Sequence, residues 1–166
     1  MARIWRVGDN VNTDQIIPGR YNVTTDRAQL AQHCLCEHRP DFAAHVAAGD
    51  VLVAGRNFGC GSSREHAAVA LKATGLAAVV AISFARIFYR NAINIGLPVL
   101  IAPEAAAALA DEDEISIDTA AGTIRDLTHD RLFQAEPLPP FVQRIVEAGG
   151  INPLVRQQGR LTASKV

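Results

Sequence analysis

A glycine-rich loop between a short apolar segment and an alanine-rich segment constrains this chain more than any other stretch. Residues 51–54 are uninterruptedly apolar, which is typical of a buried strand, and residues 63–73 have the composition of a helix. The connection, residues 55–62, contains three glycines that permit a tight turn and a close approach of a ligand to the backbone. The pattern therefore predicts a strand, a loop and a helix whose first turn faces the loop.

The predicted start of this helix carries groups suited to an anion. Ser62 and Glu65 have the spacing of a capping box, which makes Ser63 the first helical residue. Free backbone N–H groups and the positive end of the helix dipole favour negative charge there, and the Arg64 guanidinium matches a carboxylate. The alternative is an ordinary strand–helix turn without a ligand, and spacing by itself does not choose between the two.

Other chemistries fit this part of the chain less well. A Walker A loop requires a lysine that the loop lacks, and the dinucleotide fingerprint requires a third glycine where Arg64 stands. Cys60 would need a nearby base to act as a nucleophile, so a packing role is the simpler interpretation. Residues 33–38 resemble a metal cluster, but a helix would turn Cys34 and Cys36 to nearly opposite sides. We therefore predict no metal ligands in this chain.

Composition narrows the class of protein. The 166 residues are 49% hydrophobic and 5% aromatic with a net charge of −1, so aliphatic side chains must build the core and nucleic acid is not expected as a partner. Arginine supplies 14 of the 16 basic residues, a bias compatible with binding carboxylates. No apolar run suits a signal peptide or a membrane span, and three cysteines do not indicate a disulfide framework. We expect a cytoplasmic protein that does not bind membranes.

The order of the predicted elements indicates an α/β fold with a mixed sheet. Strands are expected at residues 3–7, 51–54, 77–82, 97–101, 115–118, 123–127 and 131–134. Helices are expected at residues 26–35, after Pro40, and at residues 63–73, 84–95, 104–110 and 141–148, whereas residues 15–18 should be extended. The middle alternates strand and helix as βαβ units do, and the later strands form hairpins. One domain is expected over residues 1–156, with a flexible tail over 157–166.

Three motifs, in this order, carry a resemblance to a known family. They are NTDQIIP at residues 12–18, GRNFGCGSSREHA at residues 55–67 and SFARIFYRNAINIGLP at residues 83–98. Together they resemble the small subunits of two-subunit 3-isopropylmalate dehydratases, in the aconitase superfamily. The resemblance implies a swivelling β/β/α three-layer domain with a mixed sheet, like the C-terminal domain of aconitase. It also implies a separate large subunit as partner.

The same resemblance implies the chemistry. Such enzymes are hydro-lyases that dehydrate and rehydrate a 2-hydroxy diacid, with a [4Fe-4S] cluster on the large subunit acting as a Lewis acid. Ser62 matches the catalytic base of the family, and Ser63 and Arg64 match residues that bind a substrate carboxylate. None of the three cysteines matches a cluster ligand, so the chain alone should be inactive.

The resemblance implies a substrate-selecting loop at residues 21–25, which are Tyr21, Asn22, Val23, Thr24 and Thr25, directly after Arg20. This loop has neither the Tyr-Leu-Arg-Thr expected of isopropylmalate enzymes nor the Tyr-Leu-Val-Tyr of homoaconitases. Val23 offers a small apolar surface, while Asn22 and Thr24 offer neutral hydrogen bonds. These residues favour a short or branched alkyl group, and therefore 3-isopropylmalate, in leucine biosynthesis. The alternatives are 2,3-dimethylmalate and homoaconitate, whose extra carboxylate Arg20 could bind.

Two interpretations from other classes compete with this one. A non-catalytic regulatory module that binds an anion would be expected to lose Ser62 or Arg64, and both are present. A thiol hydrolase would use Cys60, for which only His66 is a local base.

Overall fold

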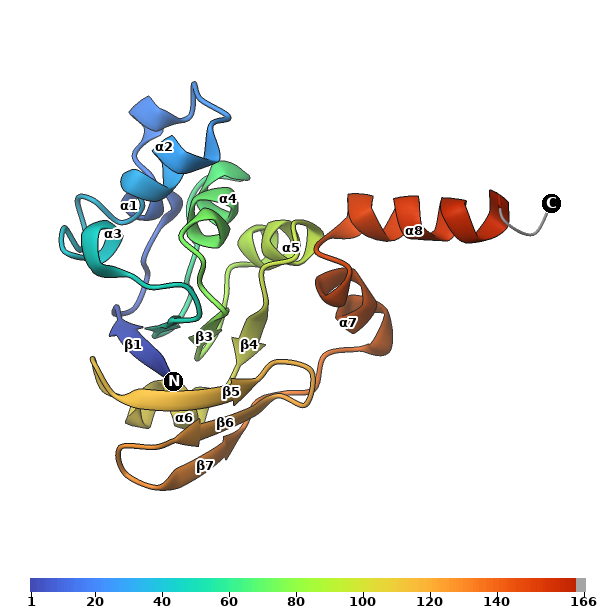
Figure 1. Ribbon diagram of the computed structural model, residues 1–166. Coiled ribbons are helices and arrows are strands. Elements are labelled where there is room, and N and C mark those ends of the chain that lie inside the picture. Colours follow the sequence, from blue (N-terminus) through green and yellow to red (C-terminus); the bar gives the residue numbers. More distant parts are fainter. Residues whose placement is uncertain (164–166) are drawn as a thin grey trace.

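The structure, a computed structural model, describes residues 1–163, which form a sheet with helices packed on it (Figure 1). The strands are β1 (Ala2–Arg6), β2 (Val51–Ala54), β3 (Ala78–Ala81), β4 (Val99–Ile101), β5 (Glu114–Asp118), β6 (Thr123–Asp126) and β7 (Arg131–Gln134). The helices are α1 (Thr13–Ile16), α2 (Arg27–Gln32), α3 (Phe42–His45), α4 (His66–Ala73), α5 (Arg86–Asn94), α6 (Pro103–Ala108), α7 (Pro140–Glu147) and α8 (Ile151–Ala163), with a 3₁₀ helix η1 at Gly19–Tyr21. None of these helices is both long enough and apolar enough to cross a bilayer.

The seven strands lie in the order β4-β3-β2-β1-β5-β6-β7. Strands β1 to β4 run parallel, with Leu52 opposite Val79 and Val80 opposite Leu100. The apolar runs of β2 and β3 are buried along their whole length, as expected for parallel strands covered on both faces. Strand β5 pairs antiparallel with β1, and β6 and β7 continue the sheet as hairpins. The mixed α/β sheet predicted from the sequence is confirmed.

Each face of the parallel strands has its own hydrophobic core, because successive side chains of a strand point to opposite faces. Leu52 and Val79 belong to the core that helices α1, α2, α4, α5 and α7 cover. Val51 belongs to the other core, together with side chains of α6 and with Ile115 and Ile124 of the antiparallel strands. Helices, parallel strands and antiparallel strands thus make the three layers expected of a β/β/α domain.

The predicted helices and strands are present, most of them with ends shifted by one to three residues, and three differences from the sequence prediction are informative. Residues 15–18 were expected to be extended, but Asn12 and Gln15 form a capping box that starts helix α1 at Thr13. The helix after the glycine loop begins at His66 rather than Ser63. Beyond residue 148 the chain forms the additional helix α8, which extends away from the sheet in Figure 1. The predicted tail is therefore helical from residue 157 to residue 163, and residues 164–166 lie outside the described part.

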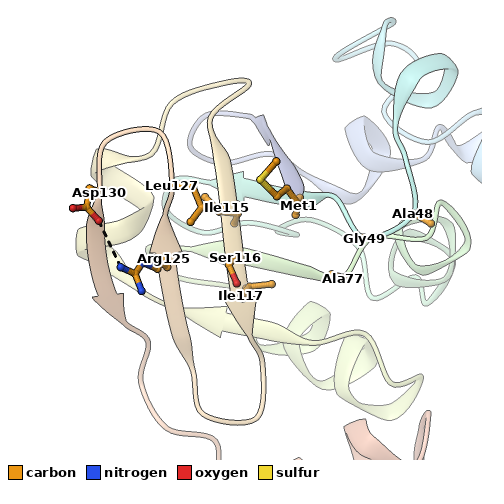
Figure 2. Close-up of a pocket in the computed structure, with 11 residues that line it drawn as sticks. Met1, Ala48, Gly49, Ala77, Ile115, Ser116, Ile117, Arg125, Leu127 and Asp130 are labelled. Atoms are coloured by element: carbon orange, nitrogen blue, oxygen red, sulfur yellow. Dashed lines mark ion pairs between the residues drawn. The ribbon is translucent and has the colours of Figure 1, made fainter.

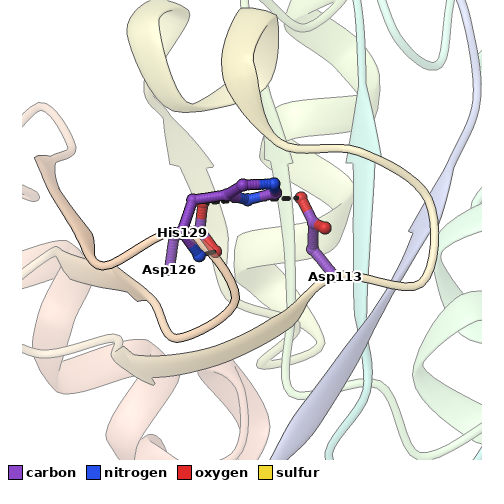
Figure 3. Close-up of side chains that lie close together, drawn as sticks. All are labelled: Asp113, Asp126 and His129. Carbon is purple, nitrogen blue, oxygen red and sulfur yellow. Dashed lines mark hydrogen bonds and ion pairs between the residues drawn. The ribbon is translucent and has the colours of Figure 1, made fainter.

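A buried carboxylate joins the antiparallel strands (Figure 3). Asp126 is fully buried and accepts hydrogen bonds from Nε and Nη2 of Arg131, at 2.9 and 2.6 Å. His129 Nδ1 lies 3.1 Å from Asp126 and 3.7 Å from Asp113. Burial acts to raise the pKa of Asp126, but the hydrogen bonds from Arg131 and His129 outweigh it and hold that pKa below the usual value. The Arg131 guanidinium supplies the positive charge that a bound cation would, so this cluster ties strands together.

We expect Asp126→Asn to lower the free energy of unfolding at pH 7 by on the order of 2 kcal/mol, because Arg131 loses its charged partner. A carboxyl whose folded-state pKa is depressed stabilises the fold above its unfolded pKa, and this contribution is lost as pH falls through the folded-state pKa. The difference between wild type and variant should therefore shrink below pH 4. Urea unfolding at pH 7 and pH 3 measures both effects, with the exposed Asp130→Asn as control. An unchanged difference at the two pH values would contradict the assignment.

Candidate active site

The three sequence motifs meet at the carboxyl ends of strands β1, β2 and β3. The backbone N–H of Thr13, after β1, donates to the carbonyl of Cys60 at 2.8 Å. The N–H of Phe58 donates to the carbonyl of Ser83 at 3.1 Å, and the N–H of Ala85 donates back to Phe58 at 2.9 Å. The glycine loop is therefore held between the first and third motifs. This is the edge of a parallel sheet where ligands of α/β proteins bind.

Two glycines give the loop its path. Gly59 has a φ of +83°, and a Cβ at this position would lie 2.2 Å from Phe88 of α5. Gly61 has a φ of +102°, and a Cβ there would lie 3.3 Å from Thr13 Oγ1. Both positions combine a left-handed backbone with a close neighbour, so the loop is shaped by contact as well as by conformation.

Ser62 lies exposed on this loop. Its N–H donates to Thr13 Oγ1 at 3.2 Å, and its Oγ accepts from the N–H of Arg64 at 3.3 Å. The capping box predicted for Ser62 and Glu65 is wrong, because Glu65 is the residue before α4 and no side chain caps that helix. Ser62 is thus four residues before the first helical residue, where the helix dipole has little effect.

Arg64 is already engaged in the structure. Its Nη1 donates to Asp14 Oδ1 at 2.9 Å, forming a salt bridge between partly exposed side chains. With its amide oxygen turned toward the guanidinium, Asn22 accepts from Nη1 at 2.7 Å and from Nε at 3.1 Å. The loop that resembles the family's substrate-selecting segment therefore touches the arginine that the same resemblance assigns to carboxylate binding. Ser63, between Ser62 and Arg64, is held through its carbonyl by Asn91 Nδ2 at 3.3 Å.

The other residues of this selecting loop differ in their surroundings. Arg20 forms an ion pair with Glu37, and its guanidinium lies 4.8 Å from the centre of the Tyr21 ring. The Tyr21 ring in turn stacks on His33, with centroids 3.9 Å apart. Val23 is 93% exposed, whereas the Thr24 hydroxyl accepts from the N–H of Asp26. Of the residues predicted to contact the substrate, Asn22 therefore contacts Arg64 and the Val23 side chain faces solvent. Arg20 and Tyr21 instead hold the loop against the rest of the protein.

A hollow of about 490 Å³ opens beside Ser62. Its lining includes the loop glycines and three side chains of α5, namely Arg86, Ile87 and Arg90. These three residues lie in the third sequence motif, but none of them was predicted to belong to the site. The sequence pattern that could have indicated them is the pair of arginines four positions apart on one predicted helix. A larger hollow of about 900 Å³ lies at the opposite, amino-terminal end of the strands, and Arg125 and Asp130, which line it, form an ion pair (Figure 2).

The cysteines that the structure describes are placed poorly for an iron–sulfur cluster. All three are free, and clusters are held by several thiolates that converge on one place. Cys34 is buried, and burial raises the pKa of its thiol far above the usual range. Burial also raises the pKa of Cys36, while Cys60 lies apart on the glycine loop. Within residues 1–163, the metal-sized group of side chains is the Asp126 cluster of Figure 3, which contains no cysteine.

Comparison with known proteins identifies the family. The profile described as the aconitase C-terminal domain matches residues 45–104. The 3-isopropylmalate dehydratase small subunit of Moorella thermoacetica is 55% identical over 151 residues, which are 91% of this chain and 91% of that protein. This chain belongs to the 3-isopropylmalate dehydratase small subunit family.

A solved structure of a similar protein has the same fold. The crystal structure of 3-isopropylmalate dehydratase from Methanocaldococcus jannaschii aligns with a TM-score of 0.94 and 42% identity, over 99% of this chain and 98% of that one. Members of the family carry different names, however. The methanogen homoaconitase small subunit of Methanothermobacter thermautotrophicus is also 55% identical, over 90% of this chain and 86% of that protein. Overall identity therefore does not choose the substrate, and the names of these small subunits imply a large-subunit partner.

Proposed function

We propose that this chain is the small subunit of a two-subunit iron–sulfur hydro-lyase that isomerises a 2-hydroxy diacid by dehydration and rehydration. The observation that supports it most is the placement of Ser62 at an open hollow, two residues from an arginine that faces the selecting loop. The [4Fe-4S] cluster is assigned to the large subunit, because the described residues of this chain do not fit it. On this proposal the enzyme acts in leucine biosynthesis in the cytoplasm.

In this proposal Ser62 removes the proton from the carbon next to a substrate carboxylate. Ser63 and Arg64 bind that carboxylate, and the guanidinium is suited to the task because it offers a planar pair of donors. Its Nη2 makes no hydrogen bond within residues 1–163, so one edge of the fork is open to substrate. Proton removal and loss of the hydroxyl together leave a carbon–carbon double bond and water.

A serine hydroxyl needs strong support to act as a base near neutral pH. The structure supplies one N–H to Ser62 Oγ, from Arg64 at 3.3 Å, and the helix begins too far away to add much. The remaining stabilisation must come from charge and water exclusion when the large subunit covers the site. The swivelling motion implied by the resemblance would bring the two surfaces together. We therefore expect no turnover from the isolated chain.

The surroundings of the selecting loop favour an alkyl-substituted substrate. A third carboxylate, as in homoaconitate, needs a cationic side chain at the loop, and Arg20 is directed to Glu37 instead. Val23 is exposed and apolar, so it can contact an isopropyl or methyl group. We therefore propose 3-isopropylmalate as the first substrate, with 2,3-dimethylmalate and homoaconitate as the alternatives.

Reconstitution with a cluster-loaded large subunit tests this function. We expect kcat/KM to be highest for 3-isopropylmalate, next for 2,3-dimethylmalate and lowest for homoaconitate, each step being about 10-fold, because apolar pockets discriminate weakly. Each subunit assayed alone is the control. A preference for homoaconitate that disappears in Arg20→Ala would show that Arg20 reorients toward the substrate, and absence of turnover on all three substrates would refute the proposed function.

A further inference from the structure

Helix α5 presents an uncommon group of side chains beside the candidate active site. Arg86, Ile87 and Arg90 are exposed and line the same hollow as Ser62. Ile87 is 51% exposed although the adjacent Phe88 is buried in the core, so α5 turns one apolar residue toward solvent between two arginines. An apolar centre bordered by arginines is typical of a surface that another protein covers.

Both arginines lack a partner among the residues that the structure describes. Across residues 1–163, neither Arg86 nor Arg90 takes part in an ion pair, side-chain hydrogen bond or ring contact, whereas Arg64 and Arg20 each do. Arg86 is also the first residue of α5, where a positive charge opposes the helix dipole and no side chain caps the helix. This local arrangement is unfavourable in the isolated chain, and carboxylates from outside would reverse it.

A small diacid cannot cover the hollow beside Ser62, which is open to solvent. A small diacid beside Ser62 would not cover a helix face that carries Ile87 and two arginines, and the proposed proton abstraction requires water to be excluded. The occupant must therefore be a surface large enough to cover helix α5 and the glycine loop together. In the proposed enzyme the large subunit is the protein that has to close over Ser62.

We propose that Arg86, Ile87 and Arg90 form a docking contact for the large subunit. The matching surface carries carboxylates that pair with the two arginines around an apolar depression that receives Ile87. This inference rests on the proposed function, since it names the place at which the partner of that enzyme docks. Covering Arg86 and Arg90 also brings the partner's surface against the hollow that contains Ser62.

The test titrates each variant of this chain against a fixed concentration of the large subunit and follows turnover of saturating 3-isopropylmalate. The double variant Arg86→Glu/Arg90→Glu should raise the concentration needed for half-maximal activity about 100-fold or more, and Ile87→Ala about 10-fold. At saturating small subunit, kcat and the KM for substrate should be near the wild-type values. Arg125→Glu, which reverses an exposed charge at the other end of the strands, is the matched control and should have no effect.

Salt provides a second readout that does not depend on charge reversal. Raising the salt concentration should weaken assembly of the wild type and weaken it less in Arg86→Gln/Arg90→Gln, because fewer charge pairs are screened. A raised KM with unchanged assembly would overturn the proposal and assign these arginines to the substrate. If wild-type subunits assemble but turn over none of the diacids, assembly measured by sedimentation still tests the docking contact, so its failure is distinct from failure of the function.

Discussion

Replacing Ser62 by alanine is expected to lower kcat by at least about 100-fold and up to about 10,000-fold, which is the usual contribution of a general base. The KM for substrate should change little, because Ser63 and Arg64, the residues proposed to bind the carboxylate, are unchanged. Circular dichroism and assembly with the large subunit should be unaffected, since the Ser62 side chain makes one long hydrogen bond to Arg64. The effect is therefore confined to the chemical step.

Steady-state kinetics on the reconstituted enzyme measure this prediction. The matched control is Ser116→Ala, which removes an exposed hydroxyl from β5, far along the sheet from the glycine loop. Exchange of the substrate proton with deuterated solvent should also stop in Ser62→Ala. Near-normal turnover in that variant would mean that the base belongs to the large subunit.

Replacing Gly59 by alanine is expected to destabilise the whole domain by on the order of 3 kcal/mol, because a strained backbone and an overpacked contact add together. The new Cβ would lie 2.2 Å from Phe88 Cγ, and the Phe88 ring cannot move freely because it packs edge-on against Phe58. The positive φ of Gly59 adds the cost of placing a side chain in the left-handed region. Relief requires the loop or helix α5 to shift.

Thermal and urea unfolding measure this effect, and the melting temperature should fall by roughly 6–12 °C. Gly8→Ala is the control, since a Cβ at that glycine has no neighbour within 4 Å and its φ is not positive. Turnover of the reconstituted Gly59→Ala enzyme should also fall, because Ser62 is three residues away on the same loop. A stable and fully active variant would show that the loop tolerates rearrangement.

The elements of the sheet were predictable because their signals are local. Uninterrupted apolar runs identified the parallel strands β2 and β3, and Asp26 identified the start of α2, where its side chain accepts from the N–H groups of residues 28 and 29. The three motifs identified the family, which the comparisons confirm. These features depend on residues close together in the sequence.

The start of α4 was mispredicted because contacts with distant segments decide it. Ser62 and Glu65 satisfy the capping pattern, but the N–H of Ser62 is bound by Thr13 and the carbonyl of Ser63 by Asn91. Those two bonds, to residues 49 and 28 positions away, hold the serines in a non-helical path. Local helix signals are weaker than such tertiary contacts.

The candidate site was only partly predictable, because several of its contacts join segments that are distant in the sequence. The motif placed Ser62, Ser63 and Arg64 on one loop. The hydrogen bonds from Arg64 to Asp14 and Asn22, however, depend on how the loops fold together. Likewise, the helix pattern of residues 84–95 could not show which arginines lack acidic neighbours. That information exists only when the whole chain is folded.

The salt bridge between Arg64 and Asp14 has a consequence for how quickly ligands bind and dissociate. If Arg64 binds the substrate carboxylate as proposed, that carboxylate has to displace the Asp14 carboxylate that already lies beside the guanidinium. This displacement makes the binding free energy less favourable. It also lowers the free-energy barrier to dissociation, because Asp14 pairs with Arg64 again as the ligand leaves. On the proposed role of Arg64, Asp14 therefore competes with each ligand that leaves a carboxylate at this site, and we expect it to shorten the time for which the ligand stays bound.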